Sequence, residues 1–185
     1  MQAWKVLSRK TLLERRWLSV SEDRVLLPNG NIIDEFHLLR TPSWAAVIAL
    51  TMDGQLVLVE QYRHGLGATS LELPGGVIDE GELPQDAARR ELREETGFTA
   101  PEFQPLIELA PEPSRSTHHA HFFFAPGAQM AGSARLEASE VIKLKLLPVE
   151  AALRALDSGQ IMHAAHVAAI LFAVRSGLLS AGARG

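Results

Sequence analysis

The sequence predicts a mixed α/β fold of the α+β type, with one mixed β-sheet covered by helices. Two observations support this prediction. The apolar runs at residues 45–50 and 56–62 are continuous enough to be central strands of a sheet. The residue patterns at 84–96 and 161–175 predict helices, with Pro84 suited to a first helical turn and a glycine directly after the first helix.

The length of 185 residues is enough for one sizeable core and short for two domains. We expect residues 1–42 to form an N-terminal β-hairpin and dimerisation segment, and residues 43–185 to form the main domain, both within one structural unit. Residues 17–27 and 32–40 predict the two strands of that hairpin, around the turn signal Pro28-Asn29-Gly30-Asn31. Further strands are expected at 103–110, 119–125 and 141–147, and a helix at 148–156.

Composition and charge exclude several classes of partner. The formal net charge of −4 provides no diffuse basic surface for nucleic acid or an anionic membrane. The absence of cysteine excludes disulfides, thiolate zinc sites and cysteine nucleophiles. The N-terminus lacks a secretory cleavage site, so we expect a cytoplasmic protein. The apolar stretch 161–179 contains His163, His166 and Arg175, which favours a buried amphipathic helix over a membrane span.

The segment GGVIDEGELPQDAARRELREETGF, residues 75–98, gathers three carboxylates on one expected helix. Glu91 and Glu95 are one turn apart and Glu94 is beside Glu95, where the helix dipole disfavours anions. One interpretation is a solvated face with the neighbouring arginines as partners. The other is a site for Mg²⁺ or Mn²⁺ that substrate phosphates complete. The spacing alone leaves both interpretations open.

The complete motif distinguishes the two interpretations. Gly76, Glu82 and the run Arg90-Glu91-Leu92-Arg93-Glu94-Glu95-Thr96-Gly97-Phe98 match the signature of the Nudix hydrolases without a departure. The resemblance implies a loop–helix–loop that binds divalent cations and hydrolyses a nucleoside diphosphate linked to another group. It further implies metal ligands at Glu91, Glu94, Glu95 and the carbonyl of Gly75, and structural roles for Gly76, Glu82, Arg90 and Gly97.

Outside this motif the chain resembles the branch that contains ADP-ribose pyrophosphatases and nucleoside diphosphate sugar hydrolases. In VEQYRHGLGATSLELPGGVID, Arg63 is at the position of a substrate-contacting arginine and suits phosphate binding, and Glu72 stands just before the Gly-Gly loop. Pro113 is at the position of a proline that marks ADP-ribose specificity, although Ser114 replaces the glycine that usually follows it. Arg115 in the same segment is a further expected substrate contact.

The resemblance also implies roles for two aromatic residues and a loop glutamate. Relatives stack the base between aromatic residues of the N-terminal strands of two subunits, and Trp17 and Phe36 are at comparable places. The alternative is that both pack within the sheet or at a dimer interface. The general base is expected at Glu140, before the last strand, with Glu137 and Glu94 as alternatives.

The resemblance therefore predicts a homodimeric Nudix pyrophosphohydrolase that cleaves ADP-ribose, or a related nucleotide sugar, with Mg²⁺ or Mn²⁺. A GDP-mannose or broad nucleotide-sugar hydrolase is the alternative enzyme. A non-catalytic ADP-ribose-sensing module is the alternative of a different class, although the motif is complete here. His118, His119 and His121 suggest a zinc site, but in a strand only two of them would share a face.

Overall fold

The computed structural model describes residues 2–136, 138 and 140–180, and the chain forms two compact units. The first unit contains the residues up to 43 together with the segment 110–119. The second contains residues 44–109 and the residues from 120 onward. The chain therefore leaves the second unit after residue 109 and returns to it at residue 120.

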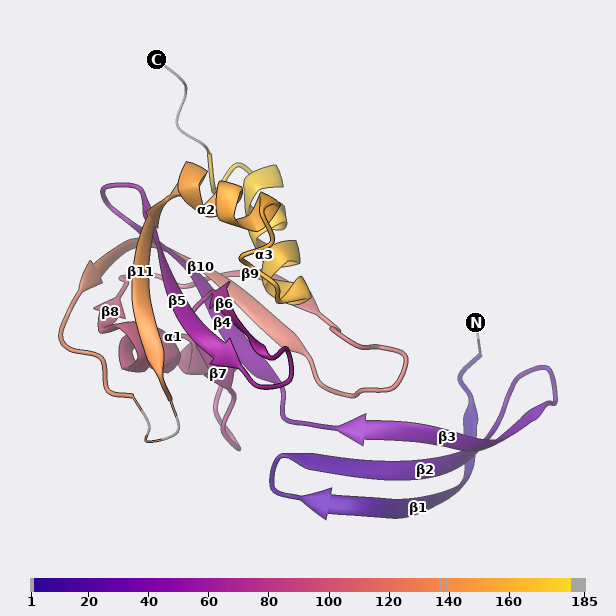
Figure 1. Cartoon of the computed structure of the whole chain (residues 1–185). Coiled ribbons are helices and arrows are strands. Elements are labelled where there is room, and N and C mark those ends of the chain that lie inside the picture. The colour runs from indigo at the N-terminus through magenta and orange to yellow at the C-terminus, as the bar shows by residue number, and fades with distance from the viewer. Residues whose placement is uncertain (1, 137, 139, 181–185) are drawn as a thin grey trace. The chain divides into compact units, whose positions relative to one another are not determined.

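The first unit is built on a three-stranded antiparallel sheet of order β1-β2-β3 (Figure 1). Its strands are β1 (Lys5–Arg15), β2 (Leu18–Leu26) and β3 (Ile32–Arg40). The predicted hairpin corresponds to β2 and β3, and β1 is an additional strand that was not predicted. Because β1 is exposed along most of its length and carries several charged residues, it lacks the apolar pattern that would indicate a strand. The segment 110–119 is held to β3 by hydrogen bonds that join Leu39 to Arg115 and to Thr117 at 2.7 and 3.1 Å.

The second unit contains an eight-stranded mixed sheet whose main order is β11-β5-β4-β10-β8. β6 pairs with β5, β7 with β4, and β9 with β10. β4 and β10 are parallel, whereas the other pairs are antiparallel. The strands are β4 (Trp44–Thr51), β5 (Gln55–Arg63), β6 (Ala68–Glu72), β7 (Gly75–Val77), β8 (Phe98–Thr99), β9 (Gln104–Leu109), β10 (Ala120–Met130) and β11 (Ile142–Pro148).

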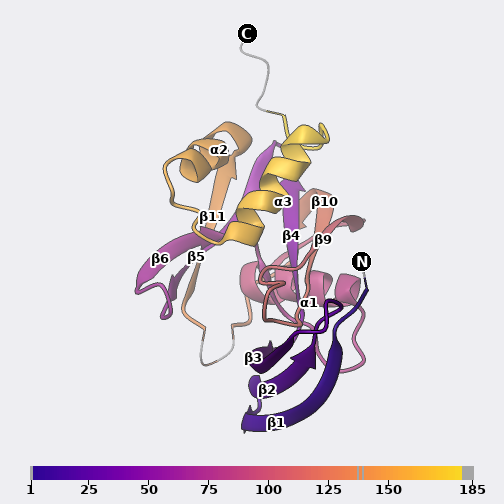
Figure 2. The ribbon, with the colours of Figure 1, turned by 90° about the vertical axis from the view of Figure 1, so that its right-hand side faces the viewer.

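Helices cover both faces of this sheet, as Figures 1 and 2 show. Side chains of β4 alternate between two apolar clusters: one contains residues of α1 (Pro84–Thr96), and the other contains residues of α2 (Val149–Asp157) and α3 (Ala164–Arg175). The predicted fold, a mixed sheet between helices, is confirmed for this unit. Within the described part of the chain, none of the helices has the length and apolar character needed to cross a membrane.

The sheet divides between β4 and β5, and this division positions the Gly-Gly loop. The two strands pair at Ala49 and Leu50 only. Beyond that point β7 pairs with the start of β4, while β6 pairs with the end of β5. The connection between β6 and β7 therefore lies in a fork of the sheet, with Glu72 at one side and Gly75 at the other. We conclude that the fork brings the loop of the motif beside the ends of two central strands.

The predicted elements agree with the structure where the sequence pattern is long and regular. The helix predicted at 84–96 has those bounds, and the five strands predicted in residues 44–148 differ at their ends by one to five residues. Three short strands, β6, β7 and β8, were not predicted. Their two to five residues are too few to establish a period.

Candidate active site

The α1 helix presents the three glutamates of the motif on the side that faces the fork. Pro84 occupies its first turn, and Gly97 ends it in the left-handed conformation, with a φ of 75°. The apolar side of the helix buries Ala87, Ala88 and Leu92 against the sheet. This packing fixes the rotation of the helix, so that the carboxylates project toward the Gly-Gly loop.

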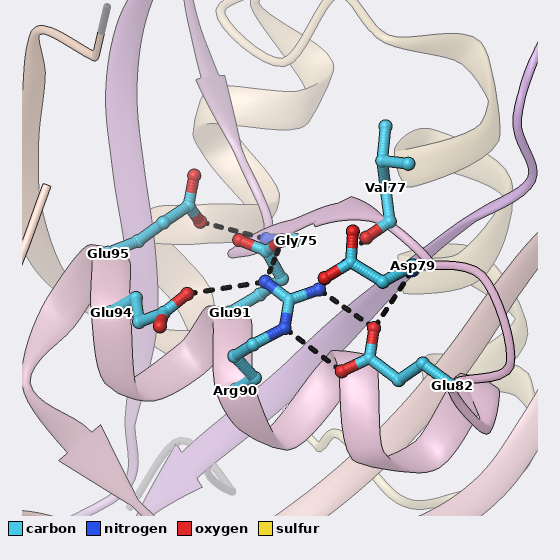
Figure 3. Close-up of polar contacts among 8 residues, drawn as sticks. All are labelled: Gly75, Val77, Asp79, Glu82, Arg90, Glu91, Glu94 and Glu95. Carbon is cyan, nitrogen blue, oxygen red and sulfur yellow. Dashed lines mark hydrogen bonds and ion pairs between the residues drawn. The ribbon is translucent and has the colours of Figure 1, made fainter. Parts of the chain in front are cut away.

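Arg90 is the centre of a polar network that joins the loop to the helix (Figure 3). Its Nε and Nη2 donate to the two carboxylate oxygens of Glu82, each at 2.9 Å, and Nη2 also donates to the carbonyl of Val77 at 2.9 Å. Its Nη1 donates to Glu91 at 2.7 Å and to Glu94 at 3.2 Å. These bonds use all five N–H groups of the guanidinium. Arg90 and Glu82 therefore have a structural role, because they hold the loop against the helix.

Two loop glycines allow the buried glutamates to approach the backbone. The N–H of Gly75 donates to a carboxylate oxygen of Glu95 at 2.8 Å. A Cβ atom added to Gly76 would collide with the carboxylate of Glu91. The absence of a side chain at residue 76 is thus a steric requirement for the position of Glu91, because the carboxylate occupies the space that a Cβ atom would take.

Burial changes the electrostatics of the two inner glutamates, which are 8% exposed at Glu91 and 5% exposed at Glu95. The pKa of Glu95 is raised to about 8, mainly by burial and in part by the charges of Glu91 and Glu140, while the Gly75 N–H and Arg63 act to lower it. Burial also raises the pKa of Glu91, which Arg90 opposes. The site therefore holds more negative charge than its own basic groups neutralise. A bound cation would compensate this excess charge.

A cleft of about 340 Å³ joins this charge cluster to the expected base and the expected phosphate-binding arginine. Its lining includes Glu95, Glu140 and Arg63. The guanidinium of Arg63 donates to both carboxylate oxygens of Glu72, at 3.0 and 2.6 Å. Sequence reasoning had placed Arg63 and Glu72 in the site separately and had missed this ion pair. Glu137, the alternative base, lies outside the described residues.

The loop that leads to Glu140 is attached to the end of α1. The N–H of Ala131 donates to the carbonyl of Gly97 at 2.9 Å, and the N–H of Arg135 donates to the carbonyl of Glu94 at 2.7 Å. A Cβ atom at residue 97 would collide with the carbonyl of Gly132. Gly97 therefore ends the helix and also leaves room for the backbone of this loop at Gly132.

Similarity to known proteins identifies the family of this site. Residues 40–167 match the NUDIX domain. The chain belongs to the NUDIX family. Residues 4–39 match a second family, the nucleoside diphosphate sugar hydrolase N-terminal domain, so the NUDIX domain follows directly after it. The prediction of a Nudix hydrolase from the motif at residues 75–98 is thereby confirmed.

Relatives of this NUDIX protein match it over most of their length. A methanol dehydrogenase activator of Bacillus methanolicus is 31% identical over 91% of each chain. An ADP-ribose pyrophosphatase of Bacillus subtilis (strain 168) is 28% identical over 91% of each chain. The crystal structure of an ADP compounds hydrolase aligns with a TM-score of 0.82 and 26% identity, covering 96% of this chain and 95% of that chain.

A divalent cation is the metal class that NUDIX hydrolases use, and the donor set of this chain fits such an ion. Glu91, Glu94 and Glu95 offer carboxylate oxygens, the ligand atoms that hard divalent cations prefer. Two of these side chains are buried, and the third is about half exposed beside Arg90. These residue types suit a hard cation, and in this structure the ligand atoms of the three glutamates do not all lie within 4.8 Å of one another.

The other expected substrate contacts of the NUDIX protein lie in the first unit. Trp17 is 52% exposed, and the guanidinium of Arg16 lies 4.4 Å from its ring centroid. Phe36 packs edge-on against Trp4, with ring centroids 5.8 Å apart. Arg115 donates to Glu112 at 2.6 Å. These contacts place Phe36 in an aromatic pair within its own unit and leave the ring of Trp17 accessible to solvent.

Two of the histidines considered for a zinc site lie outside the strand in which they were expected. Because β10 begins at Ala120, His118 and His119 precede the strand that was expected to start at residue 119. His118 instead bonds through Nδ1 with hydroxyls of Thr41 and Ser116, at 3.0 and 2.7 Å. A different cluster, Glu22, Glu35 and His37, has possible metal-ligand atoms that all lie within 4.8 Å of one another.

Proposed function

We propose that this protein hydrolyses the diphosphate bond of ADP-ribose or of a related nucleoside diphosphate sugar, giving AMP and ribose 5-phosphate from ADP-ribose. The observation that carries the proposal is the cleft in which Glu95, Glu140 and Arg63 meet. It combines a buried carboxylate, a second carboxylate on a loop and a guanidinium suited to phosphate oxygens. The names of the relatives, and the large share of each chain over which they match, support this substrate class.

We assign the metal-binding residues as Glu91, Glu94, Glu95 and the carbonyl of Gly75, with Mg²⁺ or Mn²⁺ as the ion. When bound, the cation supplies positive charge that neutralises the diphosphate and makes water at the site more acidic. Arg90 keeps the carboxylates in place through its bonds to Glu91 and Glu94. The buried positions of Glu91 and Glu95 exclude bulk water from their side chains, which strengthens their attraction for the ion.

Glu140 is assigned as the general base. It takes a proton from the attacking water as the oxygen of that water bonds to phosphorus and the bridging P–O bond breaks. Its place in the cleft with Glu95 and Arg63 supports this role over that of Glu94, which Arg90 holds on the helix. Glu137 remains the alternative on the same loop.

Substrate contacts are proposed in both units. In the second unit, Arg63 orients a phosphate group while Glu72 fixes the plane of its guanidinium. In the first unit, Trp17, Phe36 and Arg115 are proposed to contact the nucleotide, with the accessible ring of Trp17 as the stacking surface. These assignments extend the role of the N-terminal segment beyond structural support.

We further propose that residues 1–42 form a dimerisation segment beside a NUDIX domain of residues 43–185, in a homodimeric cytoplasmic enzyme. Exposed apolar side chains on the first unit, including Val6, Leu12 and Ile32, support an interface there. Light scattering should give the mass of two chains for the whole protein. A single-chain mass at micromolar concentration would exclude the dimer.

A second candidate is a GDP-mannose or broad nucleotide-sugar hydrolase. The observation that favours it is Ser114 after Pro113, in place of the glycine that accompanies ADP-ribose specificity. A panel of ADP-ribose, GDP-mannose and other nucleotide sugars, each with Mg²⁺ and with Mn²⁺, tests both candidates by kcat/KM and product analysis. We expect ADP-ribose to have the highest kcat/KM. A higher value for GDP-mannose supports the second candidate, and binding without hydrolysis of any sugar would contradict both.

A further inference from the structure

The N–H of Leu73 is a buried donor at the point where the chain leaves β6 for the Gly-Gly loop. β6 pairs with β5 as far as Glu72, and Leu73, which follows, is 1% exposed. The next residue, Pro74, has no N–H of its own. Because a buried N–H without a hydrogen-bond partner is costly, the Leu73 donor requires an acceptor from another part of the fold.

His166 in α3 supplies this acceptor. Its Nδ1 accepts the N–H of Leu73 at 3.2 Å, although the two residues are 93 positions apart in the chain. The ring of His166 is buried and packs against Trp44, Phe122 and His163, with ring centroids at 5.4, 5.8 and 4.3 Å. Burial lowers the pKa of His166, so the ring is neutral and Nδ1 has a lone pair for this bond. The acceptor is therefore held in a fixed orientation.

The residues directly after Leu73 lead into the proposed metal site. The carbonyl of Pro74 accepts a hydrogen bond of 3.0 Å from the N–H of Val47 in β4. The N–H of Gly75 donates to Glu95 of α1 at 2.8 Å. Three successive residues are thus held by α3, β4 and α1 in turn. Release of the first would allow the next two peptide groups to turn, and one of them carries the carbonyl assigned as a metal ligand.

We propose that His166 is a positioning residue for the metal site. It acts through the N–H of Leu73 on the carbonyl of Gly75 and on the bond from Gly75 to Glu95. The inference rests on the metal assignment of the proposed function and adds to it a residue of the C-terminal helix. Contacts that orient metal ligands typically change metal affinity about 10–100-fold when they are removed. We expect an effect at the low end of this range, because Leu73 is not itself a ligand.

A second hydrogen bond between the same two segments provides a matched control. The N–H of Met162, just before α3, donates to Oγ of the buried Ser70 in β6 at 3.2 Å. These two residues are 92 positions apart, so the bond joins segments as distant in the chain as those of the His166 bond. Ser70 lies within the ladder of β6 and β5, farther along the chain from Gly75. Ser70→Ala therefore tests the attachment of the C-terminal segment alone.

The test measures Mn²⁺ binding directly, by isothermal titration of the whole protein. His166→Leu keeps a buried apolar side chain but removes the acceptor, and it should weaken Mn²⁺ binding about tenfold. His166→Asn offers an amide oxygen in place of Nδ1 and should bind Mn²⁺ nearly as tightly as the wild-type protein. Ser70→Ala should also retain the wild-type affinity. The Mn²⁺ concentration that gives half-maximal hydrolysis of ADP-ribose should rise in His166→Leu by the same factor.

Three results would overturn the inference: wild-type Mn²⁺ affinity in His166→Leu, equal losses in His166→Asn and His166→Leu, or an equal loss in Ser70→Ala. The first, accompanied by a lower Tm, would show that the bond to Leu73 contributes to stability alone. Should melting curves show that His166→Leu is unfolded, His166→Met is titrated instead, because methionine adapts to irregular space.

The same titrations separate this inference from the proposed reaction. Mn²⁺ affinities in the expected order, without hydrolysis of any nucleotide sugar, would support the positioning role of His166 and overturn the proposed reaction only. Hydrolysis of ADP-ribose with equal Mn²⁺ affinity in all variants would overturn the positioning role only. Absence of Mn²⁺ binding by the wild-type protein would overturn the metal assignment and the positioning role together.

Discussion

Arg90 and Glu82 form a two-pronged ion pair beside the loop that follows Gly75 and Gly76, with both N···O distances at 2.9 Å. Glu82 also accepts a hydrogen bond of 3.0 Å from the N–H of Asp79, and Arg90 reaches the carbonyl of Val77. The pair thus ties the loop to the helix at three places. The same guanidinium holds Glu91 and Glu94, so the order of the loop and the position of the carboxylates depend on one side chain.

Replacing Arg90 by lysine should lower the free energy of unfolding by about 1–3 kcal/mol, because an ammonium group cannot satisfy the fixed fork of acceptors that the guanidinium does. Urea denaturation measures this change. Arg93→Lys is the control on the same helix, since Arg93 is exposed, and we expect a change within about 0.5 kcal/mol. Equal stability of the two variants would show that the network around Arg90 contributes little.

Gly76→Ala should reduce kcat/KM on the order of a hundredfold, because the added Cβ atom would displace the carboxylate of Glu91. Steady-state kinetics with ADP-ribose measures this loss. The control is Gly65→Ala, where a Cβ atom has no neighbour within 4 Å. A normal kcat/KM for Gly76→Ala would mean that the reaction tolerates a displaced Glu91 carboxylate.

Glu95→Gln should lose most of kcat and most of the stabilisation by Mg²⁺, because an amide is a weaker ligand than a carboxylate. Thermal melting with EDTA and with saturating Mg²⁺ compares the metal-free and metal-bound states, because an ion that binds the folded state raises Tm. The exposed Glu102→Gln is the control and should retain the full shift in Tm. A well-folded, active Glu95→Gln enzyme would contradict the metal assignment.

Glu140→Gln should bind metal and substrate normally but hydrolyse substrate about 10²–10⁴ times more slowly, as expected when a general base is removed. Isothermal titration gives the binding and single-turnover kinetics gives the rate. Glu137→Gln is compared in the same assay. A large loss in Glu137→Gln together with a normal rate in Glu140→Gln would transfer the role of base to residue 137.

His166 should make the protein less stable as the pH falls below about 6.5, the pKa of an unfolded histidine. Burial lowers the pKa of His166, helped by the charges of His163 and Arg63, and its Nδ1 accepts a hydrogen bond of 3.2 Å from Leu73 N–H. The unfolded chain therefore binds a proton at a higher pH than the folded protein does, and acid favours unfolding.

The free energy of unfolding, measured from about pH 8 to about pH 5, tests this dependence. The His166→Asn variant should show a flatter curve between about pH 6.5 and 5 than the wild-type protein. The exposed His37→Asn is the control, and its curve should parallel that of the wild-type protein. If the curves of wild type and His166→Asn are parallel, burial of His166 does not govern the acid sensitivity.

Some of the fold followed from local sequence. The helix at 84–96 was predicted with its observed bounds because Pro84 and Gly97 mark its ends through their own backbone preferences. The central strands β4 and β5 were predicted because their apolar runs are buried on both faces. By contrast, β1 was missed because it lies exposed at the edge of its sheet, where its residues are under no requirement to be apolar.

The sequence by itself determined the family and the candidate metal ligands of this protein, because the motif at residues 75–98 holds them within one loop and one helix. Only the tertiary structure decided the environment of those ligands. The high pKa of Glu95 depends on burial beneath the sheet and on Glu140, which is far away in the chain. The Arg63–Glu72 pair and the His163–His166 stack beside Trp44 likewise depend on packing. Glu140 and Trp44 are far in the chain from the residues that they act on, so no local pattern records these effects.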